Sequence, residues 1–253
     1  MANPFGTDFM AAGYAASRPA VHPRVMELAW RQLGRIEPFD CALDVGCGAG
    51  VSTRALSGFA RRRIGLEPAL AMLQFAAATA PAAEFVAGTA EALPFRDHAV
   101  DLITAAGSLN YVDPDRFFPE AARVLAPGGP LLVYDFSPGR SFRDSAALDL
   151  WFDRFHSRYP PPAHEARTLS PEILASLASG FRMHGYRHFE IGITLAPGFY
   201  LDYMMTETNV TAAVRGGTPH AEIRSWCAET LAPVWNGLER EVLFRGYFVL
   251  LLA

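Results

Sequence analysis

The residues best suited to bind a ligand lie in one glycine-rich turn and at one acidic position that follows it. Gly46, Gly48 and Gly50 alternate directly after an apolar run that ends at Val45, and Glu67 closes a second apolar run. In a sheet covered by helices, such a turn lets a ligand approach the backbone, and an acid ending the next strand accepts hydrogen bonds from both ribose hydroxyls. The spacing predicts a site for an adenosine-containing cofactor. A tight turn beside an incidental, solvated glutamate is the alternative.

The glycine spacing also indicates which adenosine cofactor fits. The fingerprint of nicotinamide dinucleotides, Gly-x-Gly-x-x-Gly, needs a third glycine at position 51, where this chain has Val51. A dinucleotide seats its pyrophosphate at a helix N-terminus, whereas a cofactor with an amino-acid tail does not. The observed pattern favours the second kind, and a nicotinamide-dependent oxidoreductase is the weaker alternative.

Alternating strands and helices are expected to position these residues. Apolar residues at helical spacing predict helices over 21–33, 51–59, 70–78 and 116–125. Short apolar runs predict strands at 40–45, 63–66, 84–87, 100–105 and 131–134, with later strands at 186–193 and 242–251. The alternation indicates a doubly wound α/β fold. We expect a mostly parallel, seven-stranded sheet with helices on both faces and an antiparallel last strand.

Two stretches rich in aromatic residues interrupt this alternation. Residues 136–169 include Trp151 and a run of three prolines, and residues 198–237 include Tyr200 and Trp226. We predict that both are helical lid insertions over a substrate pocket, and that residues 1–20 form an N-terminal flap. The whole chain, 1–253, is expected to form a single domain.

Further motifs follow the glycine turn in order. They are Gly65-Leu66-Glu67-Pro68, the segment Gly88-Thr89-Ala90-Glu91-Ala92-Leu93-Pro94-Phe95, Asp101-Leu102-Ile103, and Val124-Leu125-Ala126-Pro127-Gly128-Gly129. From Tyr14 to about Tyr134, the chain resembles the class I S-adenosylmethionine-dependent methyltransferases. The resemblance implies that S-adenosyl-L-methionine donates a methyl group to a small-molecule acceptor by in-line displacement and leaves as S-adenosyl-L-homocysteine. A non-catalytic module that binds the same cofactor is the alternative.

The resemblance also implies roles for individual residues. The cofactor-binding residues would be Tyr14, Arg18, Asp44, Gly46, Cys47, Gly48, Glu67, Pro68, Met72, Thr89, Ala90, Glu91, Ala105, Ala106 and Ser108. Glu67 would hold the ribose, Pro68 would pack on adenine, and the flap residues Tyr14 and Arg18 would close over the carboxylate. Surface roles for these two flap residues remain open. Asp44 either orders the glycine turn or makes only a local hydrogen bond.

The sequence marks the acceptor side less clearly. Because a sulfonium donor is already activated, the protein chiefly has to hold the acceptor, methyl carbon and sulfur in line. For any proton that must be removed, we name His156 and Tyr203 as catalytic candidates, beside His164, Tyr200 and Glu207. Predicted acceptor contacts are Asn110, Tyr111, Trp151, Phe155, Tyr200 and Met204. For the aromatic residues and methionines among them, packing in a core is the alternative.

The composition and charge of the chain limit the kinds of partner that it is expected to bind. The 22 basic and 26 acidic residues give a formal net charge of -4, and the cluster Arg61 to Arg63 is short, so we expect no nucleic-acid partner. The first ten residues lack the pattern of a secretory signal, and no apolar run is long enough to cross a bilayer, so we expect a cytoplasmic protein without a membrane partner. We expect a monomer or a homodimer. Cys41, Cys47 and Cys227 lack metal-ligand spacing, so we predict neither a metal nor a disulfide.

Overall fold

The computed structural model describes residues 13–162 and 166–253, which fold around one sheet. Its eight strands within these ranges lie in the order β3-β2-β1-β4-β5-β8-β6, and β7 pairs with β8. The strands are β1 Phe39–Val45, β2 Ala60–Glu67, β3 Glu84–Ala87, β4 Leu102–Ala106, β5 Pro130–Phe136, β6 Ser141–Phe142, β7 Arg182–Leu195 and β8 Arg240–Leu252. Pairing is parallel from β3 to β5, whereas β8 runs antiparallel to β5, β6 and β7.

The predicted α/β fold with an antiparallel last strand is therefore confirmed. The strand number differs from the expected seven because β6 adds a short eighth strand inside the predicted insertion 136–169. Ser141 and Phe142 pair with the part of β8 that lies beyond its pairing with β5. Two residues are too few to give the alternation by which a strand is found in a sequence.

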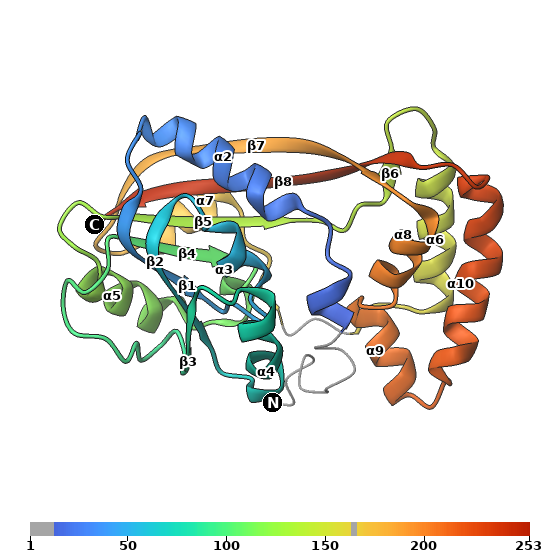
Figure 1. The fold of residues 1–253 in the computed structure, drawn as a ribbon, viewed down its shortest axis with the longest axis horizontal. Helices are drawn as coiled ribbons and strands as arrows, with labels where there is room; N and C mark the ends of the chain where they lie inside the picture. The colour runs from blue at the N-terminus through green and yellow to red at the C-terminus, as the bar shows by residue number, and fades with distance from the viewer. Residues whose placement is uncertain (1–12, 163–165) are drawn as a thin grey trace.

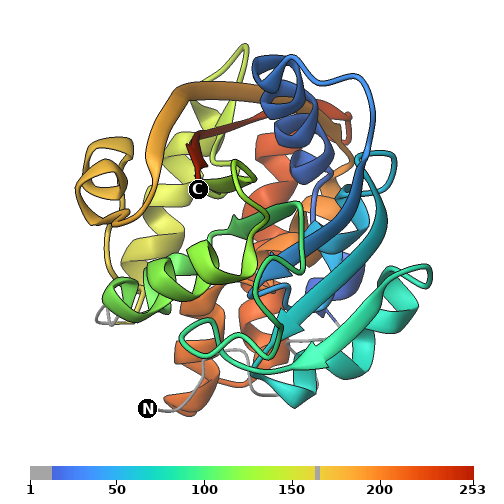
Figure 2. The same cartoon turned by 90° about the vertical axis from the view of Figure 1, so that its left-hand side faces the viewer.

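Helices cover both faces of the sheet, as Figure 2 shows. They include α2 Val21–Leu33, α3 Val51–Ala55, α4 Leu70–Thr79, α5 Pro114–Val124 and α7 Pro171–Leu177. Because side chains alternate along a strand, Leu132 and Tyr134 of β5 join the core beneath α2, whereas Leu131 and Val133 join the core beneath α5 and α7. The strand β5 is thus buried on both faces, as a central strand of such a sheet must be.

Four more helices gather at one end of the sheet (Figure 1). They are α6 Ala147–Arg158, α8 Pro197–Met204, α9 Thr208–Arg215 and α10 His220–Trp235. We call them the end helices. Helix α6 lies in the predicted insertion 136–169, α9 and α10 lie in the predicted insertion 198–237, and α10 packs against α6 and α8. The long strands β7 and β8 extend past the end of β5 toward the end helices, which joins them to the sheet.

Cys41, Cys47 and Cys227 are buried and free. Among residues 13–162 and 166–253, no helix combines the length and the apolar character that a membrane crossing requires.

Candidate functional site

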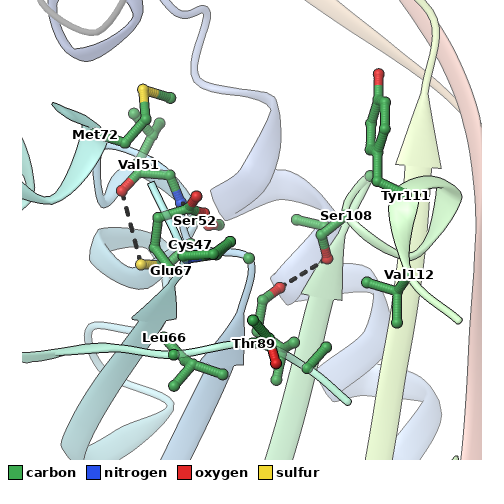
Figure 3. Close-up of a pocket in the computed structure, with 18 of the residues that line it drawn as sticks. Cys47, Val51, Ser52, Leu66, Glu67, Met72, Thr89, Ser108, Tyr111 and Val112 are labelled. Atoms are coloured by element: carbon green, nitrogen blue, oxygen red, sulfur yellow. Dashed lines mark hydrogen bonds between the residues drawn. The ribbon is translucent and has the colours of Figure 1, made fainter. Parts of the chain in front are cut away.

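A cavity of about 420 Å³ opens at the carboxyl ends of the parallel strands, within the size range of small-molecule sites. Figure 3 shows its walls, with Glu67 at the end of β2, Ser108 just beyond β4, and Tyr111 on the opposite side. The lining residues are Tyr14, His22, Val45, Gly46, Cys47, Gly48, Val51, Ser52, Leu66, Glu67, Pro68, Met72, Gly88, Thr89, Ala90, Glu91, Ala106, Gly107, Ser108, Tyr111 and Val112. Segments far apart in the sequence meet here because parallel strands end at one edge.

The glycine turn after β1 forms the floor of this cavity. The backbone amides of Gly46 and Cys47 both donate to the carbonyl oxygen of Leu66, at 2.8 and 3.0 Å. Gly46 has a φ of +69°, and a Cβ there would lie 2.3 Å from the Cβ of Ser108. Any side chain at position 46 would therefore collide with the loop after β4.

Glu67 is held at the end of β2 by backbone donors from two directions. The amide of Gly48 donates to Oε2 at 3.0 Å, and the amide of Ala69 donates to Oε1 at 2.9 Å. The residue is only 8% exposed. Burial raises the pKa of Glu67, while the two amides oppose that shift. Each carboxylate oxygen keeps a free acceptor site, so the carboxylate is fixed with two acceptors available to a ligand.

Asp44 lies behind the glycine turn and does not line the cavity. Its Oδ2 accepts the hydroxyls of Ser52 and Thr53 at 2.6 and 2.7 Å, and its Oδ1 accepts that of Thr104 at 2.9 Å. The carboxylate thereby connects β1, α3 and β4. Of the two roles left open for Asp44, this geometry favours ordering the turn.

The segments after β2 and β3 form one end of the cavity. Pro68 and Met72 line it from the start of α4, and Thr89, Ala90 and Glu91 line it from the loop after β3. All five were predicted to border the cofactor, and the structure brings them together. Ala106 and Ser108 also reach the wall, but Ala105 is fully buried within β4 and does not.

Tyr14 and Arg18, the two flap residues predicted to bind the cofactor, have different positions. Tyr14 lines the cavity, whereas Arg18 lies outside the wall, with its guanidinium 3.9 Å from the centre of the Tyr14 ring. Arg18 Nη1 lies 3.6 Å from Glu207 Oε1, and Nη2 donates to the carbonyl of Thr206 at 3.4 Å. Arg18 thus connects the chain before α2 to the corner between α8 and α9, so the prediction that it lies at the cofactor is not supported by its position. Residues 1–12 of the flap, and His164, lie outside the described residues.

Most predicted acceptor contacts lie in the core and not in the cavity. Trp151, Phe155, Tyr200 and Met204 are all fully buried. Trp151 stacks on Phe155 at 5.0 Å between ring centres and donates through Nε1 to Thr230, and Tyr200 donates to the carbonyl of Gly139. These residues join α6, α8 and α10, which need an apolar interior of their own. Packing, the alternative considered for them, accounts for their positions.

The loop after β4 contains the two remaining predicted acceptor contacts, Asn110 and Tyr111. Tyr111 lines the cavity and is 53% exposed. Asn110 turns away from the cavity and donates to Asp135 Oδ2 at 2.9 Å. The two neighbours therefore point in different directions from one short helical turn.

Neither catalytic candidate lines the cavity. Tyr203 is buried against Tyr200 and Phe244, and burial raises its pKa. His156 packs on Phe152 with ring centres 4.5 Å apart, and burial lowers its pKa. The positions of both residues do not support a role in proton removal, because the aromatic residues of the end helices pack mainly against one another.

Sequence reasoning missed several wall residues, of which His22 is the most polar. His22 is 7% exposed, and its Nδ1 lies 2.9 Å from the hydroxyl of Tyr134 on β5. Its signal in the sequence was a histidine inside the apolar face of the predicted helix 21–33, beside Val21 and Val25. The other missed residues are Val45, Val51, Ser52, Leu66, Gly88, Gly107 and Val112.

Sequence comparison matches residues 43–133 to a family model described as a methyltransferase domain. An uncharacterized methyltransferase of Mycobacterium tuberculosis is 34% identical over 118 residues, which cover 47% of this chain and 46% of that protein. A demethylmenaquinone methyltransferase of Renibacterium salmoninarum is 35% identical over 114 residues, covering 43% and 48% of the two chains. The matched part of the chain thus spans about half the length of these relatives.

Similar folds occur among solved structures. A protein of Anaeromyxobacter dehalogenans assigned as a type II methyltransferase has a TM-score of 0.65 and 24% identity, over 89% of this chain and 94% of its own. The [4+2]-cyclase SpnF has a TM-score of 0.55 and 19% identity, over 91% and 80%. At such identities these two show the fold alone. The family match over residues 43–133, the order of the strands and the glycine turn agree with one another, and the chain contains a region similar to the methyltransferase domain on a fold of the class I methyltransferase type.

Proposed function

We propose that this protein binds S-adenosyl-L-methionine in the cavity and transfers its methyl group to a small-molecule acceptor. The observation that carries the proposal is the carboxylate of Glu67, fixed by the amides of Gly48 and Ala69 beside the glycine turn. When bound, the cofactor supplies a methyl group that is already activated for transfer. The protein then has to hold the cofactor, orient the acceptor and keep water out.

The wall residues fit the parts of this cofactor. The two free acceptor sites of Glu67 match a pair of ribose hydroxyls, which a carboxylate binds well. Pro68 and Met72 offer apolar contact for adenine, and the backbone of Gly46 and Gly48, which carries no side chain, leaves room for the methionine chain. The volume of about 420 Å³ lies within the range of small-molecule sites.

We place the acceptor beside Tyr111, on the side of the cavity opposite Glu67 (Figure 3). No Lys or Arg belongs to the described wall, so a neutral acceptor suits it better than a phosphorylated one. Two relatives carry the name demethylmenaquinone methyltransferase, which makes hydroxylated aromatic compounds a rational first choice for an acceptor screen. The end helices are proposed to close this side of the pocket.

Isothermal titration with S-adenosylmethionine and S-adenosylhomocysteine tests the proposal. Glu67→Ala is expected to weaken binding roughly 10- to 100-fold, because each charge-assisted hydrogen bond contributes about 1.5 to 3 kcal/mol. Glu67→Gln keeps the side-chain length but turns an NH2 donor toward the amide of Gly48 or Ala69, so we expect a loss similar to that of Glu67→Ala. Glu239→Gln is the matched control, since Glu239 is exposed and lies outside the cavity wall.

Absence of binding to either ligand by the wild-type protein would refute the cofactor assignment. Equal affinity of wild type and Glu67→Ala would leave a bound cofactor but reject the role of Glu67. Binding without turnover in a broad acceptor screen would favour the non-catalytic module, because one fold hosts several activities. A titration with reduced nicotinamide cofactor tests the oxidoreductase alternative, which Val51 in place of glycine disfavours.

A further inference from the structure

The imidazole of His22 enters the cavity wall from the first turn of α2, and its two nitrogens have different surroundings. Nδ1 lies 2.9 Å from the hydroxyl of Tyr134. Nε2 has no hydrogen-bond partner among the described residues. It is also not fully buried, so a ligand in the cavity can reach it. Because His22 is 7% exposed and lines the cavity, Nε2 is the polar group that this ring offers to a ligand.

The partner of Nδ1 decides which nitrogen carries the proton. Burial raises the pKa of Tyr134 far above its ordinary value, so its hydroxyl keeps its hydrogen. Donation of that hydrogen to Nδ1 satisfies the buried hydroxyl and leaves the hydrogen of the neutral ring on Nε2. His22 then presents a neutral N–H donor to the cavity. Contacts of the ring with Tyr134 and Phe136, at 5.7 and 5.2 Å between centres, fix its orientation.

The charges around His22 favour an anionic ligand group at this position. Burial, and then the positive charges of Arg18 before α2 and Arg54 in α3, lower the pKa of His22 to about 3. Burial disfavours either sign of charge, whereas the positive charges of the two arginines favour a carboxylate over an imidazolium at this place. Neither arginine lines the cavity, so they act from behind the wall while the imidazole makes the contact.

We propose that the Nε2–H of His22 binds the carboxylate of the amino-acid tail of the cofactor, with Tyr134 setting the tautomer. This inference rests on the proposed function and gives His22 the contact that the resemblance implied for Arg18. Arg18 is instead engaged by Glu207 and Thr206. Tyr134 is a positioning residue, because it acts through His22.

Titration with two adenosine thioethers separates this contact from the rest of the site. S-adenosylhomocysteine carries the amino-acid tail, whereas methylthioadenosine keeps the adenosine and sulfur but lacks the carboxylate. His22→Asn retains a polar group near Nδ1 and removes the donor at Nε2. We expect it to weaken S-adenosylhomocysteine roughly 10-fold and to change methylthioadenosine less than twofold. His22→Gln places an amide near Nε2 and should restore most of the affinity.

Equal losses for both thioethers in His22→Asn, or no loss for either, would overturn the inference while the cofactor assignment stands. Failure of the wild type to bind either thioether would reject both proposals together. A second readout needs no ligand. Nitrogen-15 spectra of the histidines at pH 5 to 8 should show His22 neutral with its hydrogen on Nε2, and Tyr134→Phe should abolish that preference. A charged ring, or a hydrogen on Nδ1 in the wild type, would contradict the proposal.

Discussion

Replacing the buried carboxylate of Asp44 gives a direct test of how the glycine turn is held. Asp44→Ala removes three hydroxyl bonds, each of which contributes about 1.5 to 3 kcal/mol because the acceptor is charged. Several kcal/mol of carboxylate desolvation offset that sum, so we expect a net loss of about 3 to 5 kcal/mol of unfolding free energy. Asp44→Asn can accept from Ser52 and Thr53 and donate to Thr104, so its loss should be about 1 kcal/mol.

Urea unfolding measures both values, read as a change in midpoint at constant slope. Asp40→Asn is the matched control, since the side chain of Asp40 is 80% exposed and pairs with the surface residue Arg61. Burial raises the pKa of Asp44 in the folded protein above its value in the unfolded chain. The stability that such a carboxyl group contributes is fully present at a pH below the unfolded pKa. It is lost as the pH rises through the folded pKa. Wild type should therefore lose its advantage over Asp44→Asn as pH rises through that folded value. A loss below about 1 kcal/mol in Asp44→Ala would refute the reasoning.

Two further predictions concern positions where packing decides the outcome. Gly46→Ala should destabilise the protein and abolish S-adenosylhomocysteine binding in a calorimetric titration, because its Cβ would meet Ser108 at 2.3 Å. Gly34→Ala is the control, since Gly34 has a similar φ of +63° but open space around the added Cβ. It should lose only about 1 kcal/mol of unfolding free energy and keep full affinity. Trp151→Ala should cost about 3 to 5 kcal/mol in urea unfolding, as expected of a core residue. A Trp151 variant of unchanged stability would return that side chain to the list of acceptor contacts.

The cofactor end of the cavity could be predicted because its information is local. The strand, the glycine turn and the acid at the end of the next strand all lie within residues 39–67, and Gly46, Gly48 and Glu67 lie where the pattern indicates. The loop after β3 was found for the same reason. Its residues follow a strand that ends at the same edge of the sheet.

The acceptor end could not be predicted in this way. Aromatic residues in the insertions can line a pocket or fill a core, and only the packing of α6, α8 and α10 decides between the two. The structure places Trp151 and Phe155 inside that packing. His22 was missed for the opposite reason, since a polar residue on an apolar helix face carries no motif and becomes relevant only when Tyr134 and the cavity are seen beside it.

The strands β7 and β8 have a consequence for how ligands enter and leave. They pair along their whole length, from Arg182 opposite Leu252 to Leu195 opposite Arg240, with one irregularity between Met183 and Gly185. Helices α8, α9 and α10 therefore lie between two strands that share one hydrogen-bond ladder, which continues from the central sheet. Swinging them aside would break that ladder, so we expect traffic through the cavity to depend on the segment around Tyr14 while the end helices stay in place.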